Sequence, residues 1–450
     1  MSKRTFEERR SVLEAEKILL ICAEHIFDAI DDEAYRGYVL IKGDKIAEVG
    51  RGTAPEELMA GADRIIRFTD ELVMPGITDT HTFFIGWAIR HAGRDEETDY
   101  SDEGIARLMK TYIDQKAFME KELADYCRML NAQGVTTVKE MGFDDYYGFT
   151  DILKEKENDS SFTLRWFFMS QPVLKGMNLE YARNMREQFT GDKVRFSGFN
   201  RMTDGTIASG RGDLKKPYEK EKFTCSMDID YETIERDVLL ADREGFRWSL
   251  HCQGDGAVGK VASIYEKCEM EDGRLKNRQA LTDMEFSDPT DLERLGAIGA
   301  SAELYFQIMS LDPGEVVLEN IERTIGPERA LFYWNRRKMK DSGMNLCGAT
   351  DLPLMIPDVP ASIYYSAGGH LEGGALFNEQ NTLTAAEILK AWTRGGAYDL
   401  GMEDRIGTLK AGNYADIAVF DRDLTAPAQT DSKEAKVIMT VLNGEIVYEG

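Results

Sequence analysis

Side chains that can do chemistry stand where short apolar runs of this sequence end. Six of these runs close on an imidazole, a carboxylate or an amine: His81 on the first, Lys139 and Glu140 on the second, His251 on the fifth, Asp283 and Glu285 on the sixth, Glu303 on the seventh and Asp351 on the eighth. Active sites use such groups for acid–base chemistry, metal binding and charge stabilisation. One such residue alone is usually a strand-end cap or a solvated loop residue. His81, His251 and Asp351 together predict one shared pocket.

Histidine is scarce, because the chain has only five: His25, His81, His91, His251 and His370. Any site that needs four imidazoles would have to use nearly all of them. This count limits the metal centres that the chain can build.

Cys252 follows His251 directly, and a thiol beside an imidazole suggests nucleophilic catalysis. Adjacent residues of a strand point to opposite faces, so these two side chains should not share a site if the strand reaches Cys252. We therefore do not expect a cysteine nucleophile. The six cysteines are scattered and form no C-x-x-C pair, which is typical of free thiols in a reducing compartment.

Charge and hydropathy restrict the partners. Lys and Arg number 55 against 80 Asp and Glu, a net charge of −25, which repels phosphate backbones and anionic membranes. The first residues carry no apolar core of a secretory signal, and no apolar run approaches the ~20 residues of a membrane span. We expect a cytoplasmic protein with a small-molecule substrate, no nucleic acid or membrane partner, and a homo-oligomer as an open alternative.

The elements that must position these side chains alternate along the chain. Strand-like runs occupy residues 73–81, 134–142, 164–172, 194–205, 246–256, 280–286, 297–306 and 344–353, and helical periods lie between some of them. Eight such runs fit a (β/α)8 TIM-like barrel, which we assign to residues 75–400 as one domain. In that fold the carboxyl ends of the strands hold the chemistry, so the polar residues at the run ends would converge.

The two ends of the chain look alike. Each has a strand followed by a hairpin, at residues 38–50 and 436–450, and the second hairpin turns at Asn443-Gly444, a strong hairpin signal. We predict a composite β-sandwich domain built from residues 1–74 and 401–450. Two unrelated edge hairpins are the alternative.

Several motifs resemble those of the amidohydrolase superfamily. VMPGITDTH (73–81) resembles its first-strand motif, and SLHCQGDGAV (249–258), RMTDGTIASGRG (201–212) and GATDLP (348–353) look like segments of the branch that contains the N-substituted formamide deformylases. EDRIGTLKAGNYADIAVFDRD (403–423) is similar to the superfamily's return to the β domain, so the resemblance covers about residues 17–450. It implies a metal-dependent hydrolase on a distorted barrel with a composite β-sandwich.

The sequence departs from the family pattern at the metal. The family has a second histidine two residues after the first, where this chain has Phe83. The position of the bridging, carbamylated lysine holds Asn200, and the sixth-strand histidine position holds Asp283. The dinuclear centre of the family therefore cannot be assembled in its usual form.

The remaining residues imply a mononuclear site. His81, His251 and Asp351 would bind one divalent ion, Zn²⁺ or Mn²⁺, with Asp283 or Glu140 as a fourth ligand. Asp351 would take the proton from water, as the family's eighth-strand aspartate does, and Lys139 would stabilise an oxyanion. We assign substrate binding to Phe83, Trp87, Asp204 and Glu303. A site that has lost its metal, with Lys139, Glu140 and His251 as plain acid–base groups, stays open.

Together these features predict a hydrolase of a small cyclic or N-acylated carbonyl compound that cleaves a C–N bond. The altered ligands leave room for a ring-opening C–C hydrolase of a cyclic 1,3-diketone. A non-catalytic relative that kept the fold and lost the metal is the third hypothesis.

Overall fold

Eight parallel strands form the larger β unit of the protein, at the expected positions. The structure is a computed structural model that describes residues 17–93, 104, 107, 115–142, 149–171, 176–425 and 432–450. The strands follow one another around the sheet in sequence order: β5 (Ile77–Thr82), β6 (Val135–Glu140), β7 (Arg165–Ser170), β8 (Val194–Met202), β9 (Trp248–Cys252), β12 (Ala280–Asp283), β13 (Ser301–Leu304) and β14 (Asn345–Gly348). The predicted (β/α)8 barrel is confirmed.

The barrel closes where the eighth strand meets the first. No ladder joins β14 to β5; an isolated parallel bridge between Thr82 and Leu352 stands there instead. Thr80 Oγ1 donates to the Gly348 carbonyl at 2.9 Å. The amide of Asp351 donates to the His81 carbonyl, also at 2.9 Å. The seam therefore joins two chemistry-bearing residues from distant parts of the chain.

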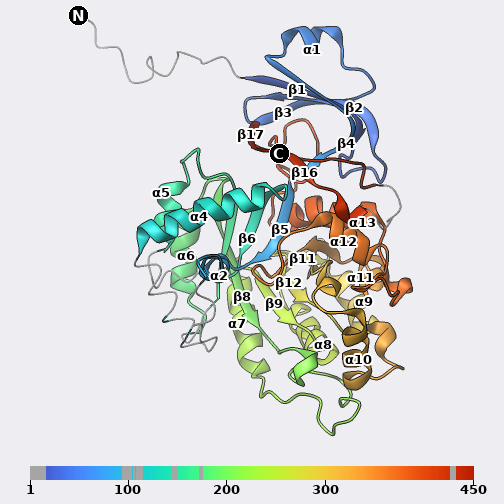
Figure 1. Ribbon diagram of the computed structural model, residues 1–450. Coiled ribbons are helices and arrows are strands. Elements are labelled where there is room, and N and C mark those ends of the chain that lie inside the picture. The colour runs from blue at the N-terminus through green and yellow to red at the C-terminus, as the bar shows by residue number, and fades with distance from the viewer. Residues whose placement is uncertain are drawn as a thin grey trace, which may run out of the picture.

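Helices surround the barrel strands (Figure 1). Their polar first turns are capped locally: Asp230 and Asp288 accept hydrogen bonds from Thr233 N and Thr290 N, and Pro289 begins its helix, where a missing N–H costs nothing. The helices are α2 (Phe84–His91), α4 (Lys116–Asn131), α5 (Phe149–Lys156), α6 (Leu179–Gln188), α7 (Tyr231–Arg243), α8 (Asp255–Tyr265), α9 (Pro289–Ala297), α10 (Gly314–Thr324), α11 (Arg336–Asp341), α12 (Val359–Ser366), α13 (Ala385–Lys390) and α14 (Gly396–Asp399).

Short elements complete the barrel unit. A small hairpin, β10 (Met270–Glu271) with β11 (Arg274–Leu275), precedes the sixth barrel strand. The remaining short turns of the barrel unit are η2 (Ile207–Ser209), η3 (Ile308–Ser310), η4 (Ala330–Phe332), η5 (Glu379–Asn381) and the π-helical η6 (Ala391–Gly395), and η7 (Ser432–Glu434) belongs to the C-terminal segment. None of the helices in the described part of the chain is long and apolar enough to cross a membrane.

The second β unit is built from both ends of the chain, as predicted, although residues 1–16 of the expected N-terminal segment lie outside the described residues. Figure 1 shows the blue strands β1–β4 and the red strands β16 and β17 together at one end of the molecule. Seven strands form one continuous sheet in the order β17 (Glu445–Glu449), β16 (Val437–Leu442), β15 (Ile417–Phe420), β4 (Arg64–Pro75), β1 (Ile18–Ile26), β2 (Tyr35–Lys42) and β3 (Lys45–Arg51), and α1 (Glu56–Gly61) connects β3 to β4. One apolar cluster on this sheet joins Ile21 and Val39 to Val419 and Val441.

A buried ion pair ties the β domain to the barrel. Arg165, at the start of barrel strand β7, donates from Nε to Asp416 Oδ2 at 2.8 Å, and its guanidinium lies 3.9 Å from the centre of the Tyr414 ring. The side chains of Arg165 and Asp416 are only 1% and 3% exposed. Because both charges are removed from water, each depends on the other.

Asp416→Ala should lower the free energy of unfolding by about 3–5 kcal/mol, since it leaves a buried guanidinium unpaired. Urea denaturation followed by circular dichroism measures the loss. The double variant Arg165→Met/Asp416→Leu should lose less than the single variant. An equal or larger loss in the double variant would contradict this account of the pair.

Candidate active site

A cavity of about 380 Å³ lies at the carboxyl ends of the barrel strands. Its lining includes His81 from β5, His251 from β9, Asp283 from β12 and Asp351 from the loop after β14. The barrel thus brings all four predicted metal ligands to one space. Phe83, predicted to bind substrate, lines the same cavity, and its ring packs edge-on against His81 with centroids 5.3 Å apart.

The four predicted ligands form two imidazole–carboxylate pairs. His81 Nε2 lies 3.8 Å from Asp351 Oδ1, and His251 Nε2 lies 3.2 Å from Asp283 Oδ2. The other ring nitrogen of each histidine is held from behind. His81 Nδ1 donates to Glu303 Oε2 at 3.4 Å, and His251 Nδ1 donates to the Asp204 carbonyl at 3.1 Å. In both rings Nε2 is therefore the atom presented to a carboxylate of the cavity.

The electrostatics link the two pairs. Burial raises the pKa of Asp351; His81 and His251 oppose that rise, and Asp283 adds to it. Burial lowers the pKa of His251, but the hydrogen bond to Asp283 and the charges of Asp283, Asp204 and Asp351 outweigh it and raise that pKa to about 9. The two pairs therefore interact through their charges. His251 is protonated at neutral pH when no metal is bound.

Two of these carboxylates stand on strained backbone. Asp283 and Asp351 have φ angles of 74° and 54°, in the left-handed region that non-glycine residues seldom adopt. Such conformations persist where the surrounding structure enforces them, and they cluster at functional sites. Asp283 is the last residue of β12, Asp351 lies three residues after the end of β14, and both line the cavity.

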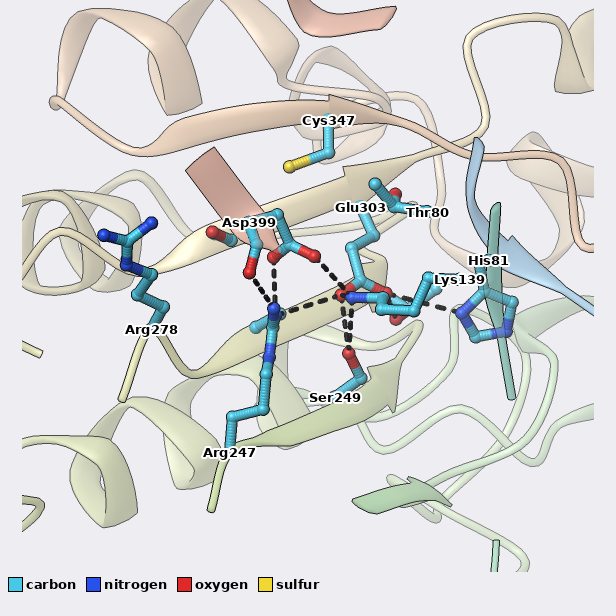
Figure 2. A network of polar contacts seen from close by, with 12 residues as sticks. Thr80, His81, Lys139, Arg247, Ser249, Arg278, Glu303, Cys347 and Asp399 are labelled. Carbon is cyan, nitrogen blue, oxygen red and sulfur yellow. Dashed lines mark hydrogen bonds and ion pairs between the residues drawn. The ribbon is translucent and has the colours of Figure 1, made fainter. Parts of the chain in front are cut away.

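A fully buried ion network lies behind His81, as Figure 2 shows. Glu303 accepts from Lys139 Nζ, from Ser249 Oγ at 2.5 Å and from Thr282 Oγ1 at 2.7 Å. Lys139 Nζ also donates to Asp399 Oδ2 at 2.5 Å. Burial alone would raise the pKa of Glu303, but the Lys139 ammonium and the His81 hydrogen bond hold it well below its usual range. Glu303 is therefore an anion that fixes the His81 ring.

Other predicted site residues lie outside the cavity lining and have structural contacts. Lys139 is 0% exposed between Glu303 and Asp399, so its ammonium is already bound by two carboxylates. Glu140 accepts from the backbone N–H groups of Phe84 and Gly142, at 2.7 and 3.1 Å, and so holds the start of α2; burial raises its pKa to about 8.

Asp204 and Trp87 also lie outside the cavity lining. Asp204 accepts from the amides of Gln253 and Gly254, at 2.8 and 2.9 Å, and so fixes the loop after β9. Trp87 packs edge-on against Tyr126 and stacks on His91, with its centroid 4.5 Å from that ring. Cys252 is 0% exposed, and burial raises its pKa well above the ordinary thiol value, which agrees with a thiol that takes no part in catalysis.

The cavity also contains residues that sequence reasoning did not assign to it. Tyr305, Tyr333, Trp334 and Asn200 line it. Tyr305 lies two residues after Glu303, so strand alternation could have placed it on the same face. Tyr333 and Trp334 follow a short 3-10 turn, and their sequence carries no signal of a place in the site.

The donor set fits one metal ion in its chemistry. Both imidazoles donate from Nδ1 to an oxygen acceptor, which is the usual supporting contact of histidines that bind a metal ion through the other ring nitrogen. Asn200 Oδ1 is buried without a hydrogen-bond partner among the described residues, which leaves an unsatisfied acceptor in the same cavity. In the described structure, however, no three of the four predicted ligands have ligating atoms that all lie within 4.8 Å of one another; the one group that does is His91, Glu122 and Asp125. Lys121 already pairs with Glu122 and Asp125 there.

Comparisons with known proteins agree with this barrel and its site. The family model described as the amidohydrolase family matches residues 85–448. The chain therefore belongs to the amidohydrolase family, a family of hydrolases, and this membership implies a divalent metal ion.

Three relatives illustrate the range of the match. The putative amidohydrolase YtcJ of Bacillus subtilis (strain 168) is 28% identical to this chain over the aligned region. That region covers 58% of this chain and 49% of YtcJ, so the chain spans about half the length of this relative. N-substituted formamide deformylase of Arthrobacter pascens is 31% identical over 47% of this chain and 38% of its own. Imidazolonepropionase of Fusobacterium nucleatum is 23% identical over 88% of this chain and 87% of its own. Among solved structures, an uncharacterized metal-dependent hydrolase from Pyrococcus furiosus has the same fold, with a TM-score of 0.71 and 16% sequence identity. The superposition covers 91% of this chain and 100% of that chain.

When metal is added to protein that a chelator has freed of metal, about one proton should be released per ion bound at pH 7.5. The reason is that His251, with its pKa of about 9, must lose its proton in order to bind a metal ion. The apparent affinity should accordingly rise about tenfold per pH unit between pH 6.5 and 9. Calorimetric titration in buffers of different ionisation enthalpy counts the proton. Binding with no proton release would show that His251 is not a ligand.

Proposed function

We propose that this protein hydrolyses a C–N bond in a small cyclic or N-acylated carbonyl compound, using one divalent ion, Zn²⁺ or Mn²⁺. The observation that carries the proposal is the pair of imidazoles, each held at Nδ1 and facing a carboxylate at Nε2 in one cavity. The named activities of two relatives, imidazolonepropionase and N-substituted formamide deformylase, support the substrate class.

We assign metal binding to His81, His251, Asp351 and Asp283. A bound divalent ion polarises a substrate carbonyl and lowers the pKa of a water molecule towards ~7. Two carboxylates in the donor set favour a harder ion than four nitrogen ligands would, which moves the preference towards Mn²⁺.

Asp351 is the proposed general base. Its side chain is 33% exposed, whereas the His81 side chain beside it is 4% exposed, so its carboxylate can meet water and substrate. Asp351 would take a proton from the attacking water and return it to the departing nitrogen.

We assign Glu303 and Lys139 to positioning. Glu303 orients the His81 ring through Nδ1, and Lys139 neutralises Glu303 from the side away from the cavity. Neither lines the cavity in the described structure, so neither is assigned a contact with substrate.

Asp351→Asn should lower kcat by about 10²–10⁴-fold, the usual contribution of a positioned acid or base. Steady-state rates on a panel of cyclic amides, N-acyl amines and cyclic 1,3-diketones, with metal content measured for each protein, test this. Cys252→Ala is the control: it changes a buried residue next to His251 on β9, outside the described cavity lining, and should keep its activity.

The panel also tests the reaction class. Release of an amine or ring opening at nitrogen supports the proposal. Activity on the cyclic diketones alone would replace it with C–C hydrolysis. An inactive protein that binds no metal would indicate a relative that has lost catalysis.

A further inference from the structure

The described wall of the cavity is acidic. Four carboxylates line it, from Asp283, Glu285, Asp312 and Asp351, and the described lining residues include neither lysine nor arginine. The buried guanidinium of Arg336 is not part of the lining: it donates to Ser366 Oγ at 2.7 Å and to the Tyr305 carbonyl at 3.0 Å, although the charges of Glu285 and Asp283 act on it. Asp283 and Asp351 are assigned to the metal ion, whose charge would balance theirs, so Asp312 carries the uncompensated charge at the exposed part of the wall. A substrate anion held away from the metal ion would meet that like charge and neither a lysine nor an arginine among the described lining residues, which is unfavourable in a partly desolvated site.

The mouth of the cavity is apolar. Met202, Leu311 and Leu354 line it and are 52%, 42% and 44% exposed. They come from three distant segments of the chain, namely the end of β8, the turn after η3 and the loop after β14. A single exposed leucine needs no explanation, but three such side chains around one opening form an apolar rim.

The polar groups that remain unpaired between rim and floor are neutral. Tyr305 OH, Trp334 Nε1 and Asn200 Oδ1 belong to lining residues and are buried without a hydrogen-bond partner in the described structure. Two of these atoms are donors and one is an acceptor. Buried polar atoms are normally satisfied, so a bound molecule or water is expected to complete them.

We infer that the substrate of this site is an uncharged molecule, with its reacting carbonyl at the floor near His81 and Asp351 and an apolar ring or chain against the rim of Met202, Leu311 and Leu354. Compounds with a free carboxylate or phosphate at the rim end are disfavoured, because they would meet the Asp312 carboxylate beside Leu311 and no lysine or arginine in the described lining. This inference rests on the proposed function and narrows its substrate class.

Three matched compounds test the charge requirement. They are an N-acylated benzylamine, its 4-carboxamide and its 4-carboxylate, and the same three ring substituents are compared on a phenyl-substituted cyclic imide. The carboxamide and the carboxylate have nearly the same shape, so the ratio of their kcat/KM values isolates charge. We expect the carboxylate to be hydrolysed at least tenfold less efficiently than the carboxamide.

Two charge-reversal variants complete the test. Asp312 is an exposed residue of the cavity wall, so Asp312→Lys should narrow the carboxamide-to-carboxylate ratio several-fold. Glu187→Lys makes the same charge change on an exposed position of α6, outside the described lining, and should leave the ratio unchanged.

Binding separates this inference from the proposed function. Calorimetry with Asp351→Asn measures the affinity of the same compounds without turnover. If none is hydrolysed but the uncharged compounds bind more tightly than the carboxylates, the proposed reaction fails and the inferred charge preference stands. Equal or better binding or hydrolysis of the carboxylates overturns the inference and leaves the reaction intact. Absence of both binding and hydrolysis overturns both.

Discussion

A carboxylate charge buried at the centre of the barrel has to be balanced, and Glu303 carries it. Its partners come from four other strands: Lys139 from β6, Ser249 from β9, Thr282 from β12 and His81 from β5. Removing an ion from water costs several kcal/mol unless hydrogen bonds and opposite charge compensate for it. The packing of five strands is thus coupled to one ionised group.

The same charge connects the interior of the barrel to the cavity above it. On one side, Lys139 and Arg247 share Asp399, which ends α14. On the other side, Glu303 fixes the His81 ring, and the seam between β5 and the loop after β14 sets Asp351 beside that ring. A change in the network would therefore alter the ring orientation as well as stability. The fold and the site are two consequences of one arrangement of charges.

The sequence predicted the barrel well because its signals are local. Six of the eight apolar runs end in an imidazole, a carboxylate or an amine, and the parallel order of the strands brings those ends together. The sequence alone therefore predicts one shared cavity for His81, His251, Asp283 and Asp351. The family could be recognised because several short motifs resembled those of the amidohydrolase superfamily and occurred in the same order along the chain.

The finer assignments depend on directions that no local pattern contains. Lys139 and Glu140 are adjacent, yet one enters the buried ion network and the other holds the start of α2. Trp87 follows the first strand closely, but its helix turns it towards Tyr126. Tyr333 and Trp334 reach the cavity from an irregular segment, and the left-handed backbone of Asp283 and Asp351 follows from tertiary contacts. Long-range packing decides such cases.

The composite sheet has a consequence for how the chain folds during synthesis. Strand β4 pairs with β1 on one side and with β15 on the other, and β15 begins only at Ile417. At roughly 5–20 residues per second, the ribosome needs on the order of tens of seconds to make the intervening chain. During that interval the edge of β4 that will face β15 lacks its native partner, and an open strand edge can pair with other chains. The nascent protein should therefore depend on chaperones most while its barrel is being made.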